Sequence, residues 1–148
     1  PLLSENGDSF YSEFSVTDCN GITYTDVVHP GSTGTTGSTR GMGAHEAKGF
    51  NRTYLNENYS TFSGTLFLSD AYAHYTNHTL TLLFEIYGDG GLIYSAPALT
   101  TGKVQSQVDV NIDISNYSKI TIHFEAINDT NMFSWEDCVF GISNACFK

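Results

Sequence analysis

The sequence predicts an all-β protein, an antiparallel β-sandwich of the jelly-roll type, and three observations predict it. Apolar and polar residues alternate with a period of two through most of the segments that carry a pattern. No window shows an apolar stripe of helical period, so the crossover helices that a parallel sheet requires have no place in the chain. Short runs of half-buried character are separated by turn residues, as in two-sheet sandwiches. A length of 148 residues suits one domain with one core.

The first part of the chain carries the weakest pattern. Residues 1–15 are polar and lack a clear period, so we interpret them as a lead-in segment and expect the single domain to occupy residues 16–148. Two short extended pieces within 16–28 flank Asn20-Gly21, a dipeptide that favours a type I′ hairpin turn. The stretch 30–39 is rich in Gly, Ser and Thr and predicts a long loop, which in a compact domain is either functional or disordered.

The remainder of the chain is strongly β in pattern. Alternation or β-rich composition predicts strands at 59–68, 80–86, 92–95, 108–114, 120–126 and 139–142. Gly88-Asp89-Gly90-Gly91 predicts the turn of a hairpin between the second and third of these. Phe62, Phe84 and Phe124 fall at the apolar parity of their strands, so we expect them in the core.

Composition excludes several classes of partner. The chain has 6 Lys and Arg against 16 Asp and Glu, a formal net charge of −10, which is a poor match for nucleic acid and for anionic membrane surfaces. No apolar run approaches the roughly 18 residues that cross a bilayer, so we expect no membrane insertion. Because the composition is rich in Ser, Thr, Asn, Gly and Tyr and no initiator Met is present, we expect a domain of a larger extracellular or cell-surface protein.

No catalytic constellation is recognisable. The five histidines form neither a His-x-His nor an HExxH pattern, and the chain lacks a GxSxG elbow and a Walker A loop, so we expect no enzyme activity. Loop aromatics such as Tyr72 and Tyr75 suit sugar recognition, because an aromatic face packs against the C–H face of a pyranose while polar side chains bind its hydroxyls. The alternative is a structural or protein-interaction domain whose surface tyrosines bind no sugar.

Three cysteines allow at most one intramolecular disulfide. Cys19 could pair with Cys138 or with Cys146, which would join the two ends of the chain. Buried free thiols account for the same residues equally well, so both interpretations stay open.

Several segments, taken in order, resemble the NPCBM family of carbohydrate-binding modules. The likeness covers residues 20–146 and rests on a basic-Gly-apolar-Gly-small-His stretch, a Tyr-Ser-x-Phe strand with an acidic end, a hairpin with an Asp-Gly turn, the strand pair that follows it and a late Trp-x-Asp. These are Arg40-Gly41-Met42-Gly43-Ala44-His45, residues 59–70, residues 82–95, residues 109–114 and 119–124, and Trp135-Glu136-Asp137. The sequence departs from the family at 130–134, which lack the Asp-His that commonly precedes the Trp.

The resemblance implies a galactose-binding-like sandwich that is appended to bacterial glycoside hydrolases or surface proteins and binds glycans with terminal sugars such as galactose. The ligand candidates that follow are Arg40, His45, Asp70, Tyr72, Tyr75, Asn131 and Trp135. Arg40 alternatively caps backbone carbonyls, His45 alternatively holds its own loop, and Trp135 alternatively belongs to the core. The family also implies a structural calcium, for which Asp18 and Asp137 are the candidates because calcium prefers oxygen ligands.

Overall fold

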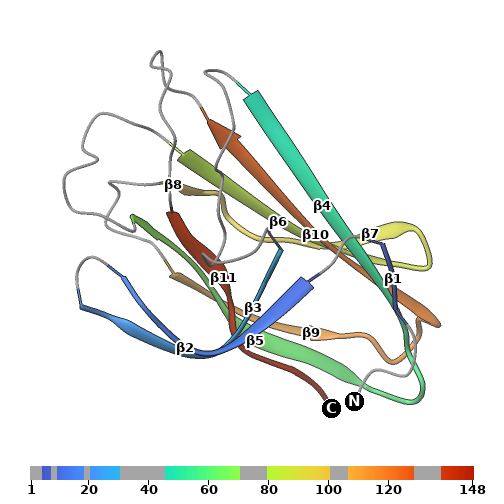
Figure 1. Cartoon of the computed structure of the whole chain (residues 1–148). Helices are drawn as coiled ribbons and strands as arrows, with labels where there is room; N and C mark the ends of the chain where they lie inside the picture. Colours follow the sequence, from blue (N-terminus) through green and yellow to red (C-terminus); the bar gives the residue numbers. More distant parts are fainter. Residues whose placement is uncertain are drawn as a thin grey trace.

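The computed structural model describes residues 5–7, 10–18, 21–30, 46–70, 80–100, 107–128 and 138–148, with the backbone alone at 5–7, 46, 69–70 and 138–139. These residues form two antiparallel sheets that pack face to face as a sandwich (Figure 1). The predicted fold class is therefore confirmed. The described segments contain no helix that is long and apolar enough to cross a membrane.

Eleven described strands make up the two sheets. The first sheet has the order β1-β4-β10-β6-β7, with β8 also paired to β6, and the second has the order β2-β3-β11-β5-β9. The bounds are β1 Glu5–Gly7, β2 Phe10–Thr17, β3 Thr23–Pro30, β4 Glu46–Leu55, β5 Thr61–Asp70, β6 Leu80–Gly88, β7 Gly91–Ser95, β8 Leu99–Thr100, β9 Gln107–Asp113, β10 Lys119–Asn128 and β11 Cys138–Phe147.

The core lies between the two sheets and is rich in phenylalanine. Phe62, Phe84 and Phe124 are at most 1% exposed, which confirms the parity predicted for their strands. The ring of Phe124 packs against Phe84 of the same sheet and against Phe140 of the opposite sheet, with centroids 5.0 and 6.1 Å away. Along β6 and β10 every second side chain is buried, which is the alternation that the sequence shows.

The expectation for residues 1–15 missed two strands. Residues 5–7 form β1 and residues 10–15 belong to β2, so this segment contributes to both sheets instead of leading into them. In β2 the half-buried positions are Phe10, Glu13 and Val16, a spacing of three that hides the period of a strand. The reason is its place at the edge of the second sheet, where little packs against it. Strand β4 was also not predicted.

The two predicted hairpin turns differ in outcome. Asp89 and Gly90 have φ values of 48° and 87°, as a type I′ turn requires, and they join β6 to β7 as expected. Between β2 and β3, however, the Asp18 N–H donates to the Ile22 carbonyl and the Ile22 N–H donates to the Asp18 carboxylate. The expected two-residue type I′ turn is therefore wrong, because the Asp18 side chain stabilises a longer turn.

Candidate functional site

Strand register brings the ends of many strands to one end of the sandwich. In the second sheet, Asp70 at the end of β5 pairs with Cys138 at the start of β11. In the first sheet, Asn128 at the end of β10 pairs with Leu80 at the start of β6 and with Glu46 at the start of β4. The strands that flank residues 31–45, 71–79, 101–106 and 129–137 all end on this side, which we call the loop end (Figure 1).

The opposite end carries short connections that are held tightly. The Asn56 N–H donates to the Ser118 carbonyl and the Ile114 N–H donates to the Ser60 carbonyl, both at 2.8 Å, so the connections 56–60 and 114–118 are bonded to each other. The Asn56 side-chain amide donates to three backbone carbonyls within 3.1 Å. This end of the sandwich is therefore fixed by hydrogen bonds between its turns.

The loop end is the side to which every predicted ligand residue is attached. Asp70 is the last residue of β5 and lies at this end. Its side chain and the other candidates lie outside the described residues, within segments whose flanking strands end here; these candidates are Arg40, His45, Tyr72, Tyr75, Asn131 and Trp135. The register thus gathers their points of attachment, and their contacts stay predictions.

Buried polar residues support the strands beneath the loop end. Asn128 is 1% exposed and His29 is 2% exposed, each next to or at the end of its strand. The His29 Nε2 donates to the Glu13 carboxylate at 3.2 Å, and the ring of Tyr11 stacks on the imidazole at 6.0 Å. This contact ties β2 to β3 close to Pro30, where the chain enters residues 31–45.

The described geometry gives Asp18 a structural role in the turn between β2 and β3. Its carboxylate is buried and accepts the Ile22 N–H at 2.9 Å. Burial raises the pKa of the neighbouring Tyr24 hydroxyl, a hydrogen bond from Gln107 lowers it, and the Asp18 charge raises it again. Among the described residues, no three His, Cys, Asp or Glu side chains are grouped as metal ligands. The calcium prediction stays a prediction, because Asp137 lies outside the described residues.

Cysteine pairing is settled for one residue. Cys146 is a free, half-buried thiol in β11, so the pairing of Cys19 with Cys146 is not formed. Cys19 and the side chain of Cys138 lie outside the described part of the chain.

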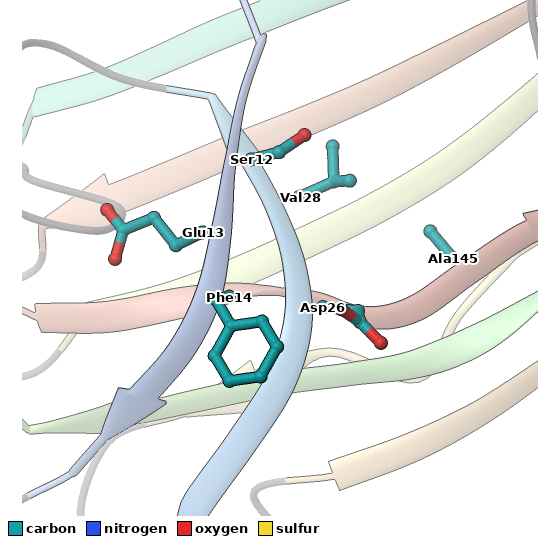
Figure 2. A pocket seen from close by; sticks show the side chains of 6 residues that line it. All are labelled: Ser12, Glu13, Phe14, Asp26, Val28 and Ala145. Carbon is teal, nitrogen blue, oxygen red and sulfur yellow. The ribbon is translucent and has the colours of Figure 1, made fainter.

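The structure places on the second sheet a pocket that was not predicted from the sequence. It has a volume of about 330 Å³ and is formed by β2, β3 and β11; its lining residues are Ser12, Glu13, Phe14, Asp26, Val28 and Ala145 (Figure 2). Half of these residues belong to the segment that was expected to be a lead-in. Aromatic and polar residues lie close together over 10–14, but they indicate no pocket without the register of β3 and β11.

Comparisons with known proteins agree with this architecture. A model of the NPCBM/NEW2 domain family matches residues 24–140. A Clostridium perfringens ZmpB structure that contains the M60 catalytic domain with CBM51-1 and CBM51-2 is 11% identical with a TM-score of 0.50, over 99% of this chain and 14% of that one. This likeness supports the same fold.

Two further structures are similar at lower scores. The CBM51 of Clostridium perfringens GH95 with methyl-galactose is 14% identical with a TM-score of 0.45, over all of this chain and 94% of that one. The structure of CBM51-2, in complex with GlcNAc, and INT domains from Clostridium perfringens ZmpB is 12% identical with a TM-score of 0.44, over 98% of this chain and 30% of that one. Curated protein sequences give no significant match. Because the family model matches most of its length, the chain belongs to the NPCBM/NEW2 domain family of carbohydrate-binding modules.

Proposed function

We propose that this module binds glycans at the loop end, with galactose-type terminal sugars as ligands, and has no catalytic activity of its own. The observation that carries the proposal is the register: the strands that flank every candidate ligand residue end on the same side of the sandwich. Membership of a carbohydrate-binding family supports the ligand class. The finer choice of galactose rests on the sequence motifs that resemble the family.

The candidate residues supply the chemistry that a sugar requires. Arg40 and His45 offer N–H donors to hydroxyl oxygens, and Asp70 offers an acceptor to hydroxyl protons. Trp135 offers the largest aromatic face for the C–H side of a pyranose. A few polar groups around an apolar surface are the usual composition of a small-molecule site, in which the polar groups fix the orientation of the ligand.

The same proposal extends to the setting of the module. We infer that it acts outside the cell or at its surface as one domain of a larger protein, which the composition of the chain supports. A structural calcium held by Asp18 and Asp137 belongs to this proposal as well. Calcium should then raise the thermal midpoint, EDTA should lower it, and both Asp18→Asn and Asp137→Asn should abolish the difference. A calcium response that only one substitution removes contradicts a shared ion.

Calorimetry with methyl-galactoside tests the ligand. Binding should be measurable in the folded protein, and Trp135→Ala should weaken it more than Trp135→Phe, because the phenyl ring keeps part of the stacking face. Leu92→Ala is the control, since this exposed side chain lies on β7, next to the turn at the opposite end, and should change nothing. Silence of the folded protein toward all sugars, with calcium present, would indicate a sandwich used for protein interaction instead.

A further inference from the structure

The geometry points to a second carbohydrate contact, in the pocket of β2, β3 and β11 and separate from the loop end (Figure 2). It rests on the proposed function for its class of ligand, a pyranose unit, but on different residues for its site.

The pocket exists because β3 and β11 stop pairing. Their register consists of Ile142 with Val28 and Ser143 with Val27. The next residue on each strand, Asp26 and Asn144, has a φ of 47° and 53°, in the left-handed region that Asp and Asn tolerate better than other side chains. The two strands therefore diverge at this point and leave a gap.

Side chains hold the gap in place. The Ser143 hydroxyl donates to the Thr25 carbonyl at 2.7 Å, and the Asn144 amide donates to the Ser143 hydroxyl at 3.2 Å. The first bond joins β11 to β3 where the backbone ladder has ended, and the second, within β11, holds the Ser143 hydroxyl. A pocket that is braced in this way keeps its shape without a ligand, which lowers the free-energy cost of binding.

The wall of the pocket combines apolar and polar side chains and is open to solvent. Val28 and Ala145 pack against the main core cluster, so they belong to the core-facing side of the second sheet. Phe14 on the edge strand β2 is nevertheless 85% exposed, the highest value among the large hydrophobic residues described. The first sheet thus leaves this part of the inner surface uncovered, and an aromatic ring stands beside an apolar floor.

Two polar groups are available to a ligand in this pocket. The Ser12 hydroxyl and the Asp26 carboxylate have no hydrogen-bond partner among the described residues. Glu13 is different, since its carboxylate accepts the His29 Nε2–H and, as Figure 2 shows, it is directed to the other side of β2 from Ser12. The Asp26 carboxylate can accept a hydrogen bond from a sugar hydroxyl, and the Ser12 hydroxyl can donate or accept one. The pocket therefore offers a ligand one charged acceptor and one neutral group.

These features fit one pyranose unit. The volume of about 330 Å³ lies at the small end of the range for ligand pockets, roughly 300–1,000 Å³. The exposed ring of Phe14 can cover the C–H face of the sugar, and the hydroxyls meet Asp26 and Ser12.

The test is an NMR titration of the full chain with methyl-galactoside and, separately, with GlcNAc. The backbone amides of residues 12–14 and 26–28 should shift and saturate. Phe14→Ala and Asp26→Asn should each weaken this response about tenfold, a loss of ~1.4 kcal/mol. Asn keeps the left-handed φ of the position, so Asp26→Asn removes the charge without changing the backbone. Ser15→Ala is the matched control, an exposed residue of β2 that does not line the pocket.

The outcomes separate this inference from the proposed function. Binding that Trp135→Ala removes, with no shifts at residues 12–14 or 26–28, overturns the second contact and leaves the loop-end site standing. Shifts in the pocket that persist in Trp135→Ala support the second contact even where the loop-end site fails. Pocket shifts that survive both Phe14→Ala and Asp26→Asn also overturn the inference. Because Phe14 is exposed, its variant should unfold in urea like the parent chain, which confirms that the fold is retained.

Discussion

Replacing Phe124 by alanine should remove a large part of the stability of the sandwich. The side chain is fully buried in β10, where its ring contacts Phe84 at 5.0 Å, Phe10 at 5.8 Å and Phe140 at 6.1 Å. Phe84 lies in the same sheet, whereas Phe10 and Phe140 lie in the opposite one. Phe124 therefore joins the two layers, and its loss opens a cavity between them.

The size of the effect follows from burial and ring contacts. A buried Phe→Ala substitution costs about 3–5 kcal/mol, and aromatic pairs contribute about 0.5–1.5 kcal/mol beyond the area they bury. With three ring partners around Phe124, we expect the upper half of that range. The free energy of unfolding of a whole domain is about 5–15 kcal/mol, so the substitution should remove a quarter or more of it.

Urea unfolding followed by circular dichroism measures this loss. The midpoint should fall while the slope stays unchanged, since the surface exposed on unfolding is nearly the same. Phe14→Ala is the matched control, the same substitution at an 85% exposed position, and should stay within about 0.5 kcal/mol of the parent. A loss below about 1 kcal/mol at Phe124, or equal losses at both positions, would refute the packing described for the core.

Three further predictions concern the end of the sandwich opposite the loop end and the second sheet. Gly88→Ala should cost about 1–3 kcal/mol in urea unfolding, because the new Cβ would lie 2.4 Å from the ring of Tyr117; a neutral effect contradicts this contact. Asn56→Asp should cost at least about 2 kcal/mol, because it places a carboxylate oxygen against the three carbonyls to which the amide donates. Asn56→Ala only removes the donor and should cost less, and the reverse order would count against the network. Burial raises the pKa of Tyr24 above its usual 10.0, so the native state holds this proton more tightly than the unfolded state and stability falls as the pH rises through about 10 and above. Tyr24→Phe should show a shallower fall between about pH 9 and pH 11, and parallel slopes would contradict the assignment.

Alternation in the sequence was sufficient for the strands that pack on both neighbours. Leu80–Gly88 and Lys119–Asn128 bury every second side chain, so their pattern is visible before the structure is known. It was not sufficient for β2, whose edge position leaves Phe14 exposed and Glu13 half-buried. Periodicity reports packing, so a strand that packs little shows little period.

The pocket was beyond sequence reasoning for a related reason. It depends on a left-handed φ at Asp26 and at Asn144, two positions that are far apart in the chain and that nothing local marks as neighbours. Only the register of β3 and β11 brings them to the same point. Asp and Asn are common in turns, so their presence within predicted strands carried no specific signal.

The end of the sandwich at which a segment lies is easier to predict from the sequence than the contacts that its side chains make. Successive strands run to opposite ends except for β7 and β8, which both pair antiparallel with β6 and so run the same way. With that exception, counting strands places the residues that follow β3, β5 and β10 together at the loop end. Counting does not place Asp18, because β3 pairs with β11 at only two positions and then leaves the ladder. Tyr24, the neighbour of Asp18, stacks on Phe67 at 3.8 Å and accepts a hydrogen bond from Gln107, the first residue of β9, so Asp18 lies near strand ends of the loop end. A calcium shared by the two aspartates, Asp18 and Asp137, therefore requires the residues that precede β11 to reach the turn between β2 and β3, whereas a sugar site at the loop end requires only neighbouring segments.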